Sequence, residues 1–575
     1  MTPTSPMTDV WAPRAATVDV VTADGSRRRL RAESTGWHRG PALPPGERYG
    51  LALDHEPRLL PDPRSHFQPE GIEGLTEVVD HGSHPWGDAG WSGFQLPGSV
   101  LYELHVGTFS DAGDFDGAIE HLDHLVDLGI DAVELMPVAE AMGRRGWGYD
   151  GVLLYAVHHA YGGPDAMKRF VDACHQRGIG VLLDVVYNHF GPKGNHLPRF
   201  GPYLDESSST PWGHPVNLDG ECAAEVRRFI IDNAIHWLSR YHLDGLRLDA
   251  THALVDRSAR HVLADLAGEV ATLAGQLERP LWLVAEREQN ELLPLRRLDA
   301  GGWGLDCRWS DDFHHAVHAA VTGEQDGYYA PFGSLADVAT AIERVHVRPG
   351  EPVGEDIPRS RFVTCIQNHD QVGNRARGER LSHLAGPAAQ MAAAALLLCT
   401  PGTPLLFQGE EWAASSPFPY FCDVADDADL GMAIREGRRA EFAAFGWEPA
   451  AVPDPIDERT FRDARLRWDE WAEQPHAAVL AFYRRLIALR RRRPDLTDAS
   501  PGGVRVDVDE RRRTVMVHRR ATSLAVNLSG SERSVPVPGE LQPGCEVLVA
   551  SHPATRIEAA AVILPPVAAC LLGRR

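Results

Sequence analysis

The sequence contains no closely spaced cysteine pairs, although it has eight cysteines in 575 residues. No two of them form a Cys-x-x-Cys motif, and they stand at Cys174, Cys222, Cys307, Cys365, Cys399, Cys422, Cys545 and Cys570. This scatter is not typical of a disulfide scaffold or of a thiolate zinc site. Because several of them lie within apolar runs, we expect buried free thiols in a reducing compartment.

Long apolar segments are also missing. The longest run, residues 391–399, is much shorter than the roughly 20 residues that cross a bilayer as a helix. Residues 1–11 lack a basic start followed by an apolar core, so the sequence predicts no signal peptide. We therefore expect a cytoplasmic protein.

Positive charge is scarce, since 57 Lys and Arg stand against 80 Asp and Glu, a net charge of −23. This balance argues against a nucleic acid or an anionic membrane as partner and favours a neutral or cationic ligand. The exception is the basic run 484–493. We expect it to cover the exposed face of a helix rather than to contact nucleic acid.

The chain is too long for one small core, which predicts two or three domains. Residues 1–97 alternate apolar and polar positions between turns rich in Pro, Gly and Asp, and this pattern predicts an N-terminal β-sandwich. The same pattern returns at 498–575 and predicts a C-terminal β-sandwich.

Residues 98–497 have a different rhythm, in which short apolar runs alternate with amphipathic helices such as 118–129 and 166–178. Both helices end at glycine, as helices commonly do. Eight such runs favour an α/β fold of the (β/α)₈ TIM barrel type over an open sheet. The runs are 100–106, 132–138, 180–189, 245–250, 281–286, 304–309, 362–370 and 403–411.

Three acids stand at the ends of three of these predicted strands, Asp249, Glu286 and Asp370. The carboxyl ends of barrel strands are where active sites form. Retaining glycoside cleavage needs a nucleophilic carboxylate and a carboxylic acid about 5–5.5 Å apart. We assign Asp249 as nucleophile, Glu286 as acid/base with a pKa raised by desolvation, and Asp370 as transition-state stabiliser.

A structural interpretation competes with this assignment, because Asp is a frequent helix N-cap after a strand. For Asp249 alone the two interpretations are about even. Three acids on separate strands, each near an Arg or His, are harder to explain by capping. On the strand 245–250, Arg247 shares a face with Asp249 and would keep that carboxylate ionised, while Leu246 and Leu248 pack outward.

Further side chains near these strand ends are candidate substrate-binding residues. His189 and His369 suit hydrogen bonds to sugar hydroxyls, and Tyr149 and Trp212 suit stacking on sugar rings. The alternatives are satisfied structural histidines and core aromatics. Asp184 is interpreted as mainly structural. The long loop 190–224 is expected to form a wall of the site.

Four short segments, DVVYNH (184–189), GLRLDA (245–250), AE (285–286) and NHD (368–370), resemble in order the motifs of the α-amylase superfamily, glycoside hydrolase family 13. The resemblance implies the same three roles for Asp249, Glu286 and Asp370. It extends over most of the chain. The segment 58–74 resembles the end of a carbohydrate-binding-module-like domain that precedes some starch-active barrels, although a structural lid without sugar affinity is the favoured alternative.

Within that superfamily, the segments 309–329, 365–375 and 407–423 resemble malto-oligosyltrehalose trehalohydrolases. The resemblance implies hydrolysis of the α-1,4 bond between a maltooligosaccharide and a terminal trehalose, which releases trehalose. The implied pathway partner is a maltooligosyl trehalose synthase. The alternatives are an α-glucan branching or debranching enzyme, or a sugar-binding barrel that has lost its activity; the three retained acids argue against the last.

One departure concerns the residues after Glu286. This subfamily usually has a Ser-Asp pair where this chain has Arg287 and Glu288. The added guanidinium is expected to alter the leaving-group subsites or to lower the pKa of Glu286. Many amylases hold calcium near the equivalent of Asn188, but the sequence offers no convincing set of oxygen ligands, so we predict that no metal or other cofactor is required.

Overall fold

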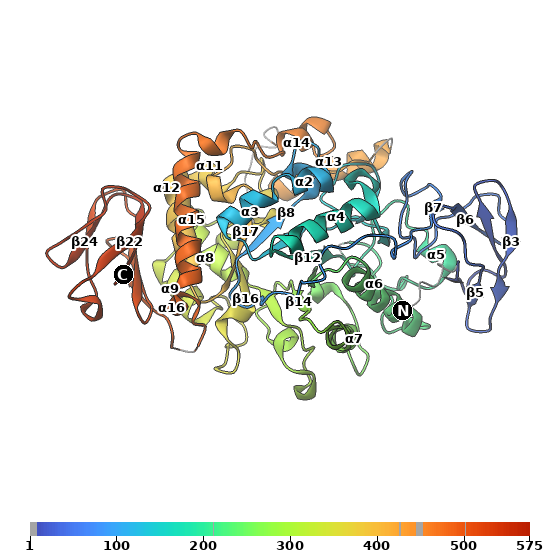
Figure 1. Ribbon diagram of the computed structural model, residues 1–575, viewed down its shortest axis with the longest axis horizontal. Coiled ribbons are helices and arrows are strands. Elements are labelled where there is room, and N and C mark those ends of the chain that lie inside the picture. The colour runs from blue at the N-terminus through green and yellow to red at the C-terminus, as the bar shows by residue number, and fades with distance from the viewer. Residues whose placement is uncertain (1–7, 211, 425–426, 444–451, 501, 575) are drawn as a thin grey trace.

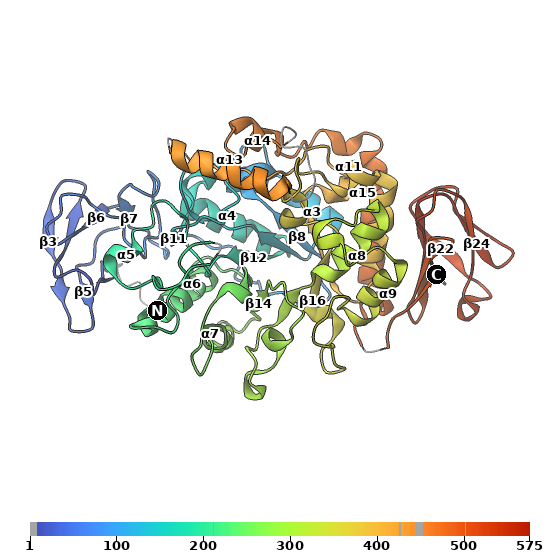
Figure 2. The ribbon, with the colours of Figure 1, turned by 180° about the vertical axis from the view of Figure 1, so that it is seen from behind.

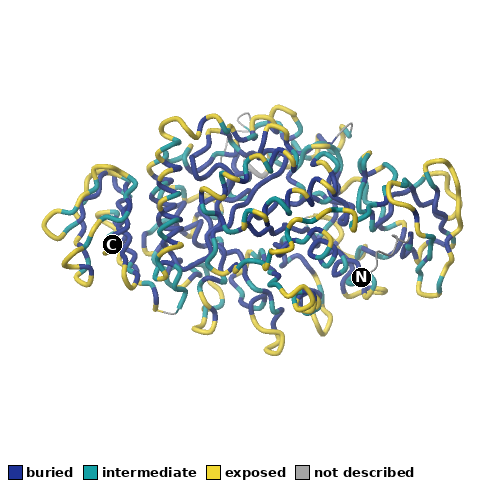
Figure 3. The backbone as a smooth tube through the Cα atoms, viewed as in Figure 1, coloured by how far each residue is buried: buried dark blue, intermediate teal, exposed yellow. Residues whose placement is uncertain are grey.

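The computed structural model describes residues 8–210, 212–424, 427–443, 452–500 and 502–574. It is an elongated molecule in which a central barrel lies between two regions of β-sheet, one at each end of the chain (Figure 1). Buried residues are concentrated in the barrel, and exposed ones follow the outer loops and the outermost strands (Figure 3).

The barrel is a closed ring of eight parallel strands, in which the last strand pairs with the first. Every predicted apolar run contains one of these strands, so the (β/α)₈ prediction is confirmed. The strands are β8 (Leu101–Leu104), β9 (Ala132–Leu135), β12 (Gly180–Val185), β13 (Gly245–Leu248), β14 (Trp282–Ala285), β15 (Cys307–Trp309), β16 (Phe362–Cys365) and β17 (Thr403–Phe407).

Helices surround this ring on the outside (Figures 1 and 2). Gly129, at φ 93°, ends α3 and donates its N–H to the Leu125 carbonyl, as the sequence predicts. No helix among the described residues is both long and apolar enough to cross a bilayer. The main helices are α3 (Leu122–Leu128), α4 (Gly163–Gln176), α6 (Ala223–Arg240), α7 (Val262–Leu277), α8 (Asp311–Thr322), α9 (Leu335–Arg344), α12 (Pro387–Leu398), α13 (Ala428–Ala443) and α15 (His476–Arg492).

The strand β13 shows why the barrel positions charged groups in its interior. Its side chains alternate, so Leu246 and Leu248 join the large apolar cluster around the ring. Arg247 points the other way and lies opposite Asp184 of β12 in the parallel register.

The N-terminal region consists of two small antiparallel sheets, in the orders β3-β2-β6-β7 and β1-β5-β4. The predicted boundary at residue 97 falls between the last of these strands and β8. The strands are β1 (Val10–Trp11), β2 (Val18–Thr22), β3 (Arg27–Arg29), β4 (Arg31–Ala32), β5 (Trp37–Arg39), β6 (Arg48–Leu53) and β7 (Thr76–Glu77).

The C-terminal region also has two antiparallel sheets, in the orders β18-β19-β20-β25-β22 and β21-β24-β23. The predicted boundary at 497 coincides with the end of α16 (Pro494–Thr497); the division into three domains stays a prediction. The strands are β18 (Arg505–Asp509), β19 (Thr514–His518), β20 (Thr522–Asn527), β21 (Arg533–Pro536), β22 (Glu546–Ala550), β23 (Arg556–Glu558), β24 (Ala561–Leu564) and β25 (Ala568–Gly573).

The basic run 484–493 forms most of α15, but the prediction that it covers an exposed face is wrong for Arg490. This side chain is 1% exposed. Its guanidinium donates to the carbonyls of Leu398 (3.0 Å), Thr400 (2.7 Å) and Gly402 (2.7 Å), and reaches that of Gly98 (3.3 Å). Arg490 therefore ties the last barrel helix to the segments around β8 and β17.

Candidate active site

A cavity of about 640 Å³ lies at the carboxyl ends of the barrel strands. Asp249 follows β13, Glu286 follows β14, and Asp370 lies in α10 (His369–Gly373) after β16. The structure thus brings the three acids together in one wall. The other sequence-predicted residues that line this cavity are Tyr149, His189, Trp212 and His369.

Asp249 is held from two sides. Arg247 donates from Nη1 to Oδ1 at 2.6 Å, and Asn188 donates from Nδ2 to Oδ2 at 3.0 Å. The next residue, Ala250, has φ 40°, a left-handed conformation that is strained for a residue with a side chain. These contacts fix the direction in which the carboxylate faces the cavity.

Arg247 itself does not line the cavity, because its side chain is 0% exposed. It also contacts both carboxylate oxygens of Asp184, at 3.0 and 2.9 Å, and its guanidinium lies 4.3 Å from the centre of the Trp309 ring. The structure therefore does not support direct contact between Arg247 and substrate, because the guanidinium is buried beneath Asp249 and contacts that carboxylate instead.

Glu286 is placed for proton transfer. Its Oε2 accepts the backbone N–H of Ala250 at 2.5 Å, and its backbone carbonyl accepts the N–H of Thr251 at 3.0 Å. Desolvation raises the pKa of Glu286 from 4.5 to about 8; Arg247 opposes this rise, and Asp249 adds to it. The predicted direction of the shift is confirmed, and the group is protonated near neutral pH.

His369 joins the cavity to the barrel interior. Its Nδ1 contacts Oε1 of Glu103 at 2.5 Å, and its Nε2 lies 2.8 Å from the Tyr149 hydroxyl and 3.4 Å from Oδ1 of Asp370. Burial by itself lowers the pKa of His369, but Asp370 and Glu103 outweigh burial and raise the pKa to about 9. His369 is therefore an imidazolium, and it donates to the Tyr149 hydroxyl, which in turn donates to Asp184 at 2.6 Å.

His189 and Trp212 also line the cavity. Nε2 of His189 contacts the Tyr149 carbonyl at 2.8 Å. The Trp212 ring lies nearly parallel to the His189 ring, with centres 6.0 Å apart and planes 20° apart. Trp212 is 45% exposed, so its face is available at the rim of the cavity.

Comparison with known proteins gives the family. Residues 88–202 match the family model for the α-amylase catalytic domain. A malto-oligosyltrehalose trehalohydrolase of Arthrobacter ramosus is 49% identical over 554 residues, which cover 92% of this chain and 94% of that protein. One from Mycobacterium tuberculosis strain H37Rv is 47% identical over 551 residues, with the same coverage. The chain belongs to the malto-oligosyltrehalose trehalohydrolase family, within the α-amylase superfamily.

Solved structures agree with this fold. A Salmonella typhimurium protein described as a candidate α-amylase has a TM-score of 0.87 and 38% identity, covering 98% of this chain and 97% of that one. A pullulanase from Anoxybacillus sp. LM18-11 has a TM-score of 0.73 at 17% identity, covering 99% of this chain and 86% of that one. The second likeness concerns the fold alone.

The acids beneath the cavity were not identified from the sequence. Asp184, interpreted as mainly structural, connects Arg247 with Tyr149, and burial raises its pKa to about 7. Glu103 and Glu134 stand opposite each other on β8 and β9, both buried. Burial also raises the pKa of Glu134 well above its ordinary value. The available signal was a glutamate inside each of two apolar strand runs.

Also not identified from the sequence was a further group of residues that line the cavity. Trp147, Tyr420 and Arg438 line it, and the Arg438 guanidinium lies 4.5 Å from the centre of the Tyr420 ring. Arg438 comes from α13 and donates to Oδ1 of Asn374 at 3.2 Å. These residues lie in loops and in an excursion after β17, where no strand-end pattern marks them.

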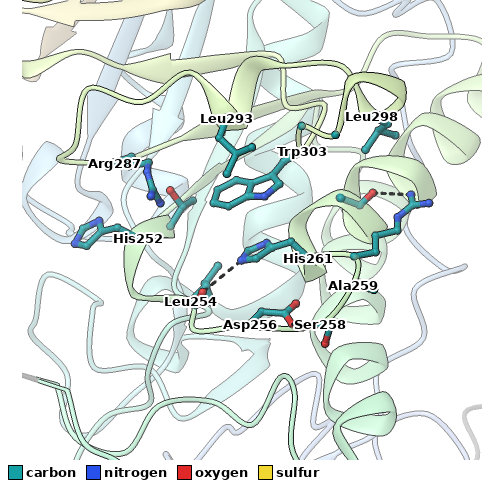
Figure 4. Close-up of a pocket in the computed structure, with 15 residues that line it drawn as sticks. His252, Leu254, Asp256, Ser258, Ala259, His261, Arg287, Leu293, Leu298 and Trp303 are labelled. Atoms are coloured by element: carbon teal, nitrogen blue, oxygen red, sulfur yellow. Dashed lines mark hydrogen bonds between the residues drawn. The ribbon is translucent and has the colours of Figure 1, made fainter. Parts of the chain in front are cut away.

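Arg287, the expected departure from the resembled subfamily, does not line the cavity that contains the three acids. It lines a neighbouring cavity of about 620 Å³, where it lies beside Trp303 (Figure 4), with its guanidinium 5.4 Å from the centre of the Trp303 ring. It also pairs with Glu291 at 2.6 Å. The arginine that lowers the pKa of Glu286 is Arg247. Because His252 lines both cavities, the cavity of Arg287 adjoins the one that contains the acids. An effect of Arg287 on the leaving-group subsites stays a prediction.

At the position where many amylases hold calcium, Asn188 contacts protein through both side-chain atoms. Its Nδ2 donates to Asp249, and its Oδ1 accepts from Nδ1 of His189. The expectation that no metal is required stays a prediction.

Proposed function

We propose that the protein is a retaining glycoside hydrolase that cleaves the α-1,4 bond between a maltooligosaccharide and its terminal trehalose, and so releases trehalose. The observation that carries this proposal is the gathering of Asp249, Glu286 and Asp370 around one cavity, in a chain 49% identical to a malto-oligosyltrehalose trehalohydrolase.

In the first step, Asp249 attacks the anomeric carbon while Glu286 donates its proton to the glycosidic oxygen, and trehalose departs. In the second step, Glu286 takes a proton from water, which attacks the same carbon and displaces Asp249. Asp249 suits the role of nucleophile because two donors hold its oxygens. Glu286 suits the role of general acid in the first step because its raised pKa keeps it protonated.

Asp370 is the proposed transition-state stabiliser, with the His369 imidazolium beside it. Positive charge that develops on the sugar ring would be stabilised by Asp370. Tyr149, His189 and Trp212 are the proposed sugar contacts around this centre.

Glu286→Gln tests the acid/base assignment. We expect trehalose release to fall about 10²–10⁴-fold, because general acid catalysis contributes that much, while binding of maltooligosyl trehalose is retained. Glu288→Gln is the matched control, since Glu288 is exposed two residues along and is not part of the cavity wall. Near-full activity of Glu286→Gln would overturn the assignment.

Product analysis on maltotriosyl trehalose and maltopentaose tests the specificity. Fast release of trehalose from the first with slow hydrolysis of the second is the expected result. Equal cleavage of both, or glucan transfer without trehalose, would instead assign the protein to general α-glucan hydrolysis or branching.

We also propose a maltooligosyl trehalose synthase as the pathway partner, because its product is the proposed substrate. A cytoplasmic location is supported by the eight cysteines, all of which are free thiols. The net charge of −23 gives no support to nucleic-acid or membrane partners.

A further inference from the structure

Three histidines meet where the N-terminal region contacts the barrel. His66 and His81 lie on either side of β7, and His236 lies in α6. Each offers one ring nitrogen, and the three nitrogens lie within 4.8 Å of one another. Segments more than 150 residues apart in the chain therefore bring three potential metal ligands to one point.

The ring contacts are close on all three sides. Nε2 of His81 lies 3.1 Å from Nδ1 of His66. The His236 ring centre is 4.3 Å from that of His66 and 5.3 Å from that of His81. Tyr241 packs beside His81 and Tyr155 beside His236. His236 is buried, and His66 and His81 are partly buried.

Two ring nitrogens of this cluster lack a protein partner among the described residues, Nε2 of His236 and Nδ1 of His81. His236 is only 7% exposed. A buried polar atom without a partner costs free energy, and native proteins rarely leave one so. Nε2 of His236, the more deeply buried of the two, is a nitrogen that a ligand bound between the three rings would satisfy.

Histidine coordinates a metal ion through a neutral imidazole nitrogen. Three cations, Arg240, Arg64 and Lys168, lie close enough to His66 to act on the cluster electrostatically.

The same three cations oppose a bound dication, but two are paired with carboxylates: Arg64 with Asp232 at 3.0 Å, and Lys168 with Asp165 at 3.7 Å.

We propose that His66, His81 and His236 bind one divalent transition-metal ion of the zinc class, which links the N-terminal region to α6. Neutral imidazoles suit Zn²⁺ and its neighbours rather than calcium or magnesium. The ion would stabilise the folded chain, because the three ligands come together only in the native state.

A second cluster, Glu140, His158 and His159, serves as an internal control. Its potential metal ligands already have hydrogen-bond partners in the protein. The two Glu140 oxygens contact Nδ1 and the backbone N–H of His159, both at 2.8 Å. Nδ1 of His158 accepts the Ala160 N–H at 3.1 Å.

The test uses the full chain, stripped with a chelator and titrated with Zn²⁺ alone by calorimetry. We expect one tight site and a higher Tm with Zn²⁺. His81→Asn and His236→Asn should each weaken binding by at least ~10²-fold, since even loss of a supporting group costs 10–100-fold, while His159→Asn should leave it unchanged.

Co²⁺ titration of the unsubstituted chain gives a second reading that needs no variant. A visible absorption band typical of nitrogen-ligated tetrahedral Co²⁺, removed by Zn²⁺, is expected. Absence of both the band and a tight Zn²⁺ site would overturn the proposal, as would tight binding that survives His81→Asn or is lost in His159→Asn. Neither reading depends on trehalose release, so failure here is distinct from failure of the proposed function.

Discussion

Two ionisable residues in the cavity hold their protons above neutral pH for opposite reasons. Desolvation keeps Glu286 uncharged up to about pH 8. His369 stays charged up to about pH 9, because Asp370 and Glu103 outweigh its burial. At neutral pH the site therefore contains a proton donor and a fixed positive charge.

The first prediction concerns activity against pH. Because Glu286 must carry a proton to assist the leaving group, kcat/KM should fall tenfold per unit as pH rises above about 8. A pH profile on maltotriosyl trehalose measures this. An alkaline limb that begins below about pH 6 would contradict the raised pKa.

The second prediction concerns stability. Between pH 4.5 and about 8 the folded state holds the Glu286 proton and the unfolded chain does not. The contribution of Glu286 to stability therefore falls as pH rises through this window, by at most about 1.4 kcal/mol per unit. Glu286→Gln cannot lose a proton, so its Tm should rise relative to wild type from the acid end of the window to the alkaline end. A Tm difference that does not change with pH would contradict this.

For single residues, the sequence predicts the side chains at the ends of strands, but it does not predict contacts between side chains of different strands. Asp249, Glu286 and Asp370 are marked by their position at the ends of apolar runs. The link from Asp184 to Tyr149 and Arg247 joins β12, β13 and a loop, and no local pattern contains it. Arg247 is predicted on the correct face, but its complete burial depends on Asp184 and Trp309.

Among the elements, α15 shows how a charged run can hide a buried residue. Arg490 follows Leu486 by four residues and Ile487 by three, and all three are buried. This helical spacing was visible in the sequence, whereas the carbonyls that accept from Arg490 were not. The eight barrel strands were predicted because each is a short apolar run between helices.

The third prediction follows from these contacts. Arg490→Met leaves buried carbonyls of Leu398, Thr400 and Gly402 without their donor, and should destabilise the protein by about 3 kcal/mol or more. Arg491→Met is the matched control, because Arg491 is 52% exposed and pairs with Asp131 at the surface. It should cost about 1 kcal/mol or less. Equal losses of Tm in the two variants would contradict the role of Arg490.

Across the whole molecule, Arg64 is one of several polar links between the N-terminal region and the barrel. It donates to the Tyr155 hydroxyl at 2.9 Å and to Asp232 at 3.0 Å. Its guanidinium also lies over the rings of Tyr155 and Phe229. This junction, like the histidine cluster beside it, joins distant segments and so has no local sequence signal.

The fourth prediction is that Arg64→Met loosens this junction. We expect a loss of roughly 1.5–3 kcal/mol, typical of hydrogen bonds to a charged group, and faster amide exchange in β2 and β6 than in the barrel strands. Arg58→Met, which removes an exposed pair with Glu73, is the control. Unchanged exchange in Arg64→Met would show that the other contacts across this junction are sufficient to hold the region.

The closure of the ring also affects how the chain folds during its synthesis. β8 pairs with β17, so Leu101 has no partner on that side until Leu405, about 300 residues later in the sequence, has been synthesised. At ribosomal rates of roughly 5–20 residues per second, one side of β8 stays unpaired for roughly 15–60 s in every molecule synthesised. Such an open edge can pair with other chains. Slower translation lengthens that interval, so the yield of folded protein should depend on how fast residues 105–407 are translated.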